Sequence, residues 1–342
     1  MSSTIHESQA TSGRVVELGR PWRGVGPFLF ASHHLDAYPQ GNGAMGPDAD
    51  LSDRPLGQDM RNPSGWSMYH GTEVPGFPAH PHRGFETITI VRKGYVDHAD
   101  STGASARYGP GDVQWVTAGR GVSHSEMFPL VRDDAPNPFE IYQIWLNLPA
   151  LSKGAAPEFT MQWAEDIPVV ESGGARVHVI AGSYGGAAAL DAPRASWAAD
   201  AASDTAVWLI DLEPGASVEL PAATLPEAVR MVYVHGEGGV EIDGEQVPTG
   251  FGYEQDDVAP VTVTAGDRPA VLLVLQSVDL GEPIAQYGPF VMNTEAEIRQ
   301  AFLDYQRTEF GGWEWDSTAP VHPKDETRFA RHGDGRLERP GA

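Results

Sequence analysis

Two short motifs place four potential metal ligands in this 342-residue chain: His80-Pro-His82 and His124-Ser-Glu126. In each motif the two candidate ligands stand two positions apart, a spacing that puts both side chains on one face of a β-strand. Imidazole and carboxylate groups together are typical ligands of non-haem iron and related divalent metals. If the two segments are neighbouring strands, the spacing predicts that the four side chains converge on one metal centre inside a β-barrel.

The sequence around the motifs has the pattern of short β-strands. Residues 87–91 form the β-branched run Thr-Ile-Thr-Ile-Val, and Gly94 interrupts it. Further apolar or alternating runs, separated by turns rich in Gly and Pro, occupy residues 113–116, 141–146, 206–212, 229–234, 261–264 and 271–275. Several short strands at this spacing predict a sandwich or barrel in each half of the chain.

Three other kinds of segment are expected. Thr294-Glu-Ala-Glu297 is a capping box followed by apolar residues at helical spacing, which predicts a helix over residues 294–308. Residues 36–79 are rich in Gly, Pro, Asp and Asn and lack periodicity, so we interpret them as a long loop that is a lid over the site, a surface decoration or a subunit contact. The N-terminus, 1–13, and the C-terminal tail, 311–342, are expected to be loosely held.

Composition excludes several classes of function. The formal net charge is −24, which argues against a nucleic-acid partner because such proteins need a basic patch. The chain has no cysteine, so disulfides, thiolate chemistry, iron–sulfur clusters and Cys-based zinc sites are excluded. No stretch reaches the length of a membrane span and the N-terminus has no signal-peptide pattern, so we expect a cytoplasmic protein without membrane contact.

Five segments carry a family resemblance: His80-Pro-His-Arg-Gly-Phe-Glu-Thr87, Pro110-Gly-Asp-Val-Gln-Trp115, Thr117-Ala-Gly-Arg-Gly121, His124-Ser-Glu-Met127 and Gly288-Pro-Phe-Val-Met-Asn-Thr294. They resemble the signature of the pirin family, within the cupin superfamily. The resemblance implies an all-β bicupin, that is, two cupin-type β-barrels with a C-terminal helix. It implies an N-terminal barrel over residues 14–152 that carries the metal site, and a C-terminal barrel over residues 153–310 without metal ligands.

The resemblance also implies a ligand set and a metal. The family's ligands match His80, His82, His124 and Glu126 without a gap. Fe(II) is the leading metal, with Mn, Ni, Cu and Zn as alternatives, because affinity order alone does not fix the metal in a cell. Matching the two halves of the chain places Ala222 and Thr224 at the positions of the first two histidines, so we expect no metal in the second barrel.

Other residues near the motifs are candidates for roles beside the metal ligands. Glu86 stands where a general cupin pattern has a glutamate ligand, whereas the pirin pattern uses Glu126. We therefore interpret Glu86 as a residue that orients an imidazole, or as part of an ordinary salt bridge. His98 is interpreted as a half-buried histidine without a metal role. The aromatic residues Phe85, Trp115 and Trp145 are expected to line a pocket or to fill the core.

Three imidazoles and one carboxylate leave two positions open on an octahedral metal, as an oxygenase requires. The resemblance implies a reaction of the quercetin 2,3-dioxygenase type, in which O₂ reacts with a flavonol-like or other small enolisable aromatic substrate. Glu126 would be the catalytic group that accepts the substrate's proton. The alternative is a non-catalytic, iron-binding, redox-responsive regulator that acts through a protein partner. Both hypotheses use the same ligands.

Overall fold

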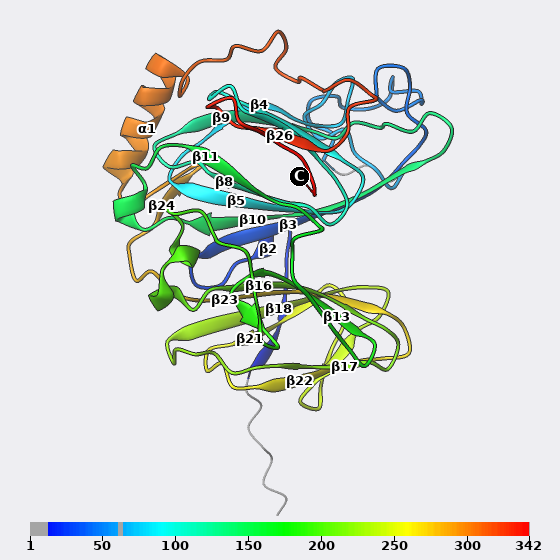
Figure 1. Cartoon of the computed structure of the whole chain (residues 1–342), viewed down its shortest axis with the longest axis vertical. Coiled ribbons are helices and arrows are strands. Elements are labelled where there is room, and N and C mark those ends of the chain that lie inside the picture. The colour runs from blue at the N-terminus through cyan, green and yellow to red at the C-terminus, as the bar shows by residue number, and fades with distance from the viewer. Residues whose placement is uncertain (1–12, 61–63, 342) are drawn as a thin grey trace, which may run out of the picture. The chain divides into compact units, whose positions relative to one another are not determined.

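The computed structural model describes residues 13–60 and 64–341, so nearly all of the expected loose N-terminus, 1–13, lies outside the described residues. The described chain consists mainly of β-strands, and the expected all-β class with a C-terminal helix is confirmed (Figure 1). It divides into two compact units, each assembled from distant segments. To the extent that they are described, unit 1 contains residues 1–26, 168–189 and 200–279, and unit 2 contains residues 27–167, 190–199 and 280–342.

Unit 2 contains two large antiparallel sheets, and both candidate motifs lie on one of them. One sheet has the strand order β11-β8-β5-β10-β3, and the other has the order β27-β26-β7-β6-β9-β4. The elements are β3 (Phe28–Tyr38), β4 (Gly76–His82), β5 (Phe85–Lys93), β6 (Val96–Asp100), β7 (Ser105–Tyr108), β8 (Val113–Thr117), β9 (Val122–Met127), β10 (Asn137–Asn147), η1 (Ala150–Ser152), β11 (Glu158–Gln162), η2 (Trp197–Ala199), β24 (Ala285–Tyr287), β25 (Phe290–Met292), α1 (Glu295–Thr308), β26 (Phe329–Arg331) and β27 (Leu337–Glu338).

Unit 1 has a seven-stranded sheet in the order β1-β21-β18-β23-β16-β13-β12, a four-stranded sheet in the order β17-β22-β19-β20, and the small pair β14-β15. The elements are β1 (Arg14–Glu17), β2 (Trp22–Arg23), β12 (Val169–Ser172), β13 (Ala175–Ala181), β14 (Ser183–Tyr184), β15 (Ala187–Ala188), η3 (Ala201–Ser203), β16 (Ala206–Leu212), β17 (Ser217–Leu220), β18 (Ala228–Gly236), β19 (Val240–Ile242), β20 (Glu245–Val247), β21 (Phe251–Gln255), β22 (Val261–Ala265) and β23 (Ala270–Val278).

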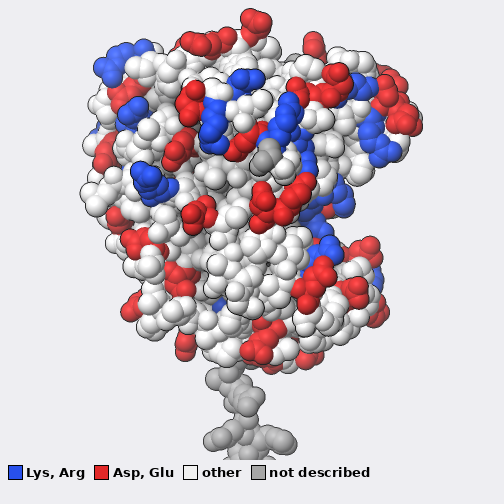
Figure 2. Space-filling view, viewed as in Figure 1, with Lys and Arg blue, Asp and Glu red and all other residues white. Residues whose placement is uncertain are grey.

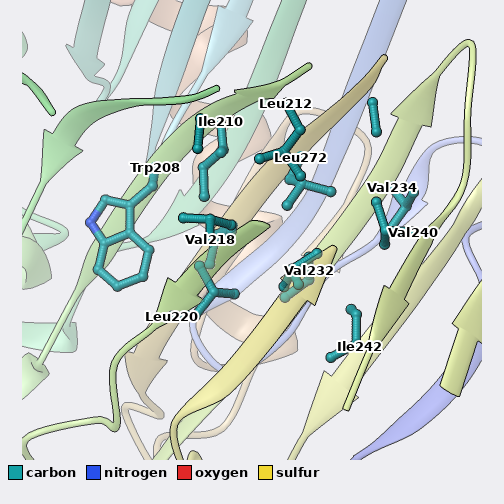
Figure 3. Close-up of a cluster of buried hydrophobic side chains, with 14 of the residues drawn as sticks. Trp208, Ile210, Leu212, Val218, Leu220, Val232, Val234, Val240, Ile242 and Leu272 are labelled. Atoms are coloured by element: carbon teal, nitrogen blue, oxygen red, sulfur yellow. The ribbon is translucent and has the colours of Figure 1, made fainter. Parts of the chain in front are cut away.

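The core of unit 1 is aliphatic. Alternate residues of its strands, such as Val232 and Val234 of β18, point into one buried cluster with Ile210 and Leu272 (Figure 3). Ala222 and Thr224 lie in the connection between β17 and β18. No group of three potential metal ligands lies wholly within the described part of unit 1.

The units are not contiguous in sequence, and the expected barrel limits of 14–152 and 153–310 stay a prediction. β1 pairs with β21, with Arg14 opposite Glu254, and therefore belongs to unit 1. The segment after residue 280, including α1, belongs to unit 2. The assignment of β1 and α1 to these units depends on contacts between residues more than 200 positions apart, which local sequence patterns do not reveal.

The expected helix is confirmed as α1. Thr294 is its N-cap, and the hydroxyl of Thr294 accepts a hydrogen bond from the backbone N–H of Glu297 at 3.3 Å. The Glu297 carboxylate in turn accepts from the backbone N–H of Asn293 at 3.1 Å. Ile298 and Ala301 are the buried residues of the helix, as their spacing of three predicts.

The long segment 36–79 is partly strand, since its first residues end β3 and its last residues belong to β4. The described residues between these strands are held by a buried carboxylate. Asp36 accepts hydrogen bonds from the backbone N–H of Ser67 at 2.8 Å and from the hydroxyl of Tyr69 at 2.7 Å. The segment is therefore packed onto unit 2, and its role as a lid stays a prediction.

The expectation of a loose C-terminal tail is wrong. β26 pairs with β7, with Phe329 opposite Arg107, and extends the sheet that contains β9 and β4. Arg107 is 2% exposed, forms a bidentate ion pair with the fully buried Asp97, with both distances 2.7 Å, and also donates to the carbonyl of Pro323 at 2.7 Å. Backbone hydrogen bonds and a buried ion pair thus hold the tail, and neither gives a hydrophobic pattern in the sequence.

We predict that Arg107→Ala lowers the free energy of unfolding by about 3–5 kcal/mol, because it leaves the carboxylate of Asp97 buried without its cation. Urea unfolding followed by tryptophan fluorescence measures the change. Arg336→Ala is the control: Arg336 is 57% exposed in its ion pair with Glu338, and its loss should cost less than about 1 kcal/mol. Equal costs for the two variants would contradict the structural role of Arg107.

Candidate metal centre

Pairing of β4 with β9 brings the two motifs together. His80 lies directly opposite His124 in the antiparallel register, and His82 follows on the same face of β4. One nitrogen atom from each of these three imidazoles lies within 4.8 Å of the other two. The predicted convergence of the three histidines is therefore present in the structure.

The orientation of His80 is set by its own backbone. Its Nδ1 lies 2.9 Å from the carbonyl oxygen of Pro78 and must carry the proton in this hydrogen bond. The other ring nitrogen, Nε2, is then unprotonated in the neutral ring and lies 3.1 Å from Nε2 of His124. His80 therefore presents a lone pair to the centre of the cluster.

The cluster is buried and rich in unsatisfied nitrogen atoms. His124 is fully buried and His82 is 4% exposed. Within the described chain, both ring nitrogens of His82 and Nδ1 of His124 lack a hydrogen-bond partner. Burial lowers the pKa of His80 to about 4 and lowers the pKa of His82 and His124 well below the ordinary value, so all three rings are neutral near pH 7. Neutral imidazoles, with buried and unpaired ring nitrogens on His82 and His124, fit a divalent metal.

Glu126 lies beside the three histidines and is 2% exposed. Its Oε2 is 3.7 Å from Nε2 of His124 and accepts a hydrogen bond from the side-chain amide of Gln143 at 2.8 Å. Its Oε1 accepts from the hydroxyl of Thr89 at 3.3 Å. Burial raises the pKa of Glu126, while the neighbouring His98 and these two donors act in the opposite direction. The carboxylate is thus held next to the cluster by two neutral donors.

Glu86 does not face the imidazoles, so the interpretation that it orients one of them is wrong. Phe85 and Glu86 are consecutive in β5 and point to opposite faces. The Phe85 ring lies 5.0 Å from the His82 ring, whereas the Glu86 carboxylate accepts from the hydroxyl of Thr117 at 2.6 Å. Glu86 is fully buried, and burial raises its pKa to about 7.

His98 is closer to the cluster than the sequence suggested. It is fully buried rather than half-buried, and it lies opposite Glu126 in the pairing of β6 with β9. Its Nε2 lies 3.2 Å from Oδ2 of Asp100, and its ring centroid lies 5.4 Å from that of His124. Asp100 stands at i+2 from His98, and this spacing was the available signal for a third polar pair facing the barrel interior.

An aromatic surface adjoins His82. The rings of Phe85 and Trp145 are stacked with their centroids 4.0 Å apart, and Trp145 lies 5.2 Å from His82. Trp145 is partly exposed and donates its indole N–H to the side-chain oxygen of Gln143 at 3.2 Å. Trp115 belongs to the same strand face as Thr117 and therefore lies on the side of Glu86. Two of the three expected aromatic residues thus border the cluster.

Two family models match the chain. The pirin domain matches residues 14–146, and the pirin C-terminal cupin domain matches residues 207–311. A pirin-like protein of Caulobacter vibrioides is 34% identical over 267 residues, which cover 77% of this chain and 90% of that protein. The chain belongs to the pirin family. The family models also confirm that this pirin-family chain has two cupin-type domains, as expected for a bicupin.

Other proteins similar to this pirin-family chain have enzymatic names. A Pseudomonas aeruginosa protein named "Putative quercetin 2,3-dioxygenase PA2418" is 37% identical over 237 residues, 69% of this chain and 79% of that protein. The crystal structure of a quercetin 2,3-dioxygenase from Acinetobacter baumannii aligns with a TM-score of 0.68 and 31% identity, over 84% of this chain and 86% of that one. Among the described residues, no helix has the length and apolar character needed to cross a bilayer.

We predict that Glu86 makes the free energy of unfolding fall as the pH rises from about 4.5 to about 7. The folded state keeps the Glu86 proton in this range because its pKa is about 7, whereas the unfolded chain, with the ordinary value near 4.5, has lost it. The loss is complete above pH 7 and is on the order of 2–3 kcal/mol. Glu86→Gln keeps an acceptor for Thr117 and should remove this dependence.

Urea unfolding of wild type and Glu86→Gln at pH 5 and pH 8 measures the effect. The free energy of unfolding of the variant, relative to that of wild type, should be higher at pH 8 than at pH 5. The expected change is on the order of 2 kcal/mol. A stability difference between the two proteins that is the same at both pH values would contradict a raised pKa at Glu86.

Proposed function

We propose that this chain is a metal-dependent dioxygenase of the quercetin 2,3-dioxygenase type, acting on a flavonol-like or other small enolisable aromatic substrate. The observation that carries the proposal is the cluster of three neutral imidazoles, those of His82 and His124 buried and that of His80 partly buried, with nitrogen atoms within 4.8 Å of one another. The fold of the Acinetobacter baumannii quercetin 2,3-dioxygenase, at 31% identity, supports it. His80, His82, His124 and Glu126 would hold the metal, with Fe(II) as the leading metal and Mn, Ni, Cu or Zn as alternatives.

The bound metal would supply Lewis acidity and, with iron, one-electron chemistry toward dioxygen. The protein supplies orientation. The Pro78 carbonyl fixes the tautomer of His80, and burial keeps all three imidazoles neutral, so that their lone pairs are available near pH 7. Burial also excludes water from the site and lowers the local dielectric constant. Any charge that forms there therefore interacts more strongly with its neighbours.

Glu126 is the proposed catalytic base. Burial raises the pKa of its carboxyl, which favours acceptance of a proton from an acidic enol hydroxyl. Gln143 and Thr89 each donate to a different oxygen of this carboxylate, so its orientation is fixed before substrate binds. Proton transfer to Glu126 would neutralise a buried negative charge at the moment when the substrate becomes an enolate.

The substrate class is inferred from the surface beside His82. The stacked rings of Phe85 and Trp145 form an apolar wall, and Trp145 is partly exposed, so a planar aromatic molecule can pack against it. The net charge of −24, with acidic side chains spread over the face drawn in Figure 2, supports small-molecule rather than nucleic-acid partners.

A non-catalytic regulator with a protein partner would use the same metal centre. In that function a change in oxidation state would alter the charge of the centre by one unit without turnover. No contact within the described part of unit 2 favours this alternative over catalysis, and the turnover experiment distinguishes the two functions.

We predict one transition metal per chain after anaerobic reconstitution, measured by elemental analysis. Glu126→Gln should lower metal affinity by more than about 100-fold, because a direct anionic ligand is lost. Glu86→Gln is the matched control and should retain one metal per chain, because Glu86 faces away from the cluster. Two metals per chain, or an empty site in Glu86→Gln with a full site in Glu126→Gln, would contradict the assignment.

We predict that the Fe(II)-loaded protein consumes O₂ in the presence of quercetin and that His82→Ala, which removes one imidazole, does not. An oxygen electrode follows consumption, and absorbance follows loss of the flavonol. Consumption with another enolisable aromatic but not with quercetin would point to another substrate. A fully loaded protein that consumes no O₂ with quercetin or other enolisable aromatics, but changes partner binding on oxidation, would favour the regulator.

A further inference from the structure

A C-terminal segment, residues 309–331, lies on the outer face of the strands that carry the proposed ligands. We name it the strap. It begins at the end of α1 and reaches β26, in orange to red in Figure 1. The family models stop at residue 311, so most of the strap lies beyond the part of the chain that they match.

The strap is bonded to residues that immediately precede two proposed ligands. The hydroxyl of Ser123, the residue before His124, donates to the carbonyl oxygen of Glu309 at 3.0 Å. The backbone N–H of Ala79, the residue before His80, donates to the carbonyl oxygen of Thr318 at 2.7 Å. Consecutive side chains of a strand face opposite sides, so the contact of Ser123 lies on the side of the sheet away from the His124 imidazole, and the contact of Ala79 is made by the backbone of the edge strand β4.

The contact at Ala79 occurs at a β-bulge. Phe77 lies opposite Glu126 and His80 lies opposite His124, so β4 advances three residues while β9 advances two. A bulge displaces backbone groups from the ladder, and the displaced N–H of Ala79 is satisfied by the strap.

The same bulge orients the proposed ligand on the inner side. The carbonyl of Pro78 accepts the hydrogen bond from Nδ1 of His80. Proline has no backbone N–H, so at the bulged positions only Ala79 can donate to the strap. The hydrogen bond from Ala79 to Thr318 and the hydrogen bond from His80 to Pro78 therefore depend on one local backbone conformation.

The strap is anchored independently on both sides of Thr318. The indole N–H of Trp315 donates to the carbonyl oxygen of Asp100 at 2.9 Å. On the other side, the backbone N–H of His322 donates to the buried carboxylate of Asp97 at 2.8 Å, and Arg107 donates to the carbonyl of Pro323. Thr318 is therefore held at the bulge by anchors on β6 and β7, rather than resting on it loosely.

We propose that the strap is a positioning element for the metal centre: it fixes the β4 bulge from outside, and the bulge fixes the orientation and tautomer of His80 inside. The proposal rests on the proposed metal-binding function of His80. The positioning residue is Thr318. Its backbone carbonyl accepts the hydrogen bond from Ala79, which holds the bulge, and the carbonyl of Pro78 in the same bulge holds the imidazole of His80.

The test replaces residues 314–320 with a Gly-Ser linker of equal length, which leaves the Arg107 anchor and β26 in place. Nitrogen-15 NMR of the metal-free protein reports the His80 tautomer, and a Co(II) titration reports affinity and the visible spectrum of the bound ion. We expect wild type to show the Nδ1–H tautomer. The linker variant should show a mixture of tautomers, an altered Co(II) spectrum, and an affinity lowered about 10–100-fold, as for loss of a group that orients a ligand.

Lys324→Ala is the control, because Lys324 lies in the strap but pairs with Asp133, away from the bulge, at 2.6 Å. It should leave tautomer, affinity and spectrum unchanged. A folded linker variant with the wild-type tautomer, affinity and spectrum would overturn the proposal. If the linker variant is unfolded by circular dichroism, the double variant Trp315→Phe with Ser317→Ala, which removes one anchor and one turn hydrogen bond beside Thr318, replaces it under the same criteria.

Failure of the proposed function is distinguishable from failure of the strap proposal. Wild-type protein that binds no Co(II) would overturn the metal centre itself. In that case the comparison of the His80 tautomer between metal-free wild type and the linker variant would by itself test whether the strap positions His80. Wild type that binds Co(II), with a variant that binds it identically and keeps its tautomer, would leave the centre intact and remove the strap from the mechanism.

Discussion

The antiparallel pairing of β4 with β9 is the constraint on which the site depends. It sets His80 opposite His124, and the two-residue period of each strand then places His82 and Glu126 on the same interior face. A shift of β4 by one residue against β9 would turn His80 and His82 away from the face that His124 and Glu126 occupy. The strands beside the pair, β6 next to β9 and β5 and β10 in the facing sheet, supply the residues that hold or border the cluster.

Burial controls the electrostatics of the cluster. Burial keeps the three imidazoles neutral, and Glu126 receives hydrogen bonds from the neutral donors Gln143 and Thr89. The buried ion pair of Arg107 with Asp97 lies apart from the cluster. There the two opposite charges pair with each other, and Arg107 also donates to the backbone carbonyl of Pro323. An interior with unpaired lone pairs is costly in free energy unless something binds there, and this cost is the physical argument for a metal centre.

The two units use similar strand patterns for different purposes. In unit 1 the inward positions of β18 are the aliphatic residues Val232 and Val234, which contribute to a continuous core. In unit 2 the inward positions of β9 are His124 and Glu126. An aliphatic interior stabilises its barrel directly by burying apolar surface. A polar interior needs support from outside, and in unit 2 the C-terminal segment supplies part of it through the hydrogen bonds to Ala79 and Ser123.

The sequence by itself determined the features that depend on local period and on short motifs. The i+2 spacing of the two motifs predicted a shared strand face, and the capping box at Thr294 predicted α1, because both follow from backbone geometry within a few residues. Only the tertiary structure decided the side to which Glu86 faces, the burial of His98 beside Glu126, and the docking of the tail at Arg107. Each of these depends on which strands are neighbours and in what register, and such pairings join residues that are distant in sequence and have no local pattern.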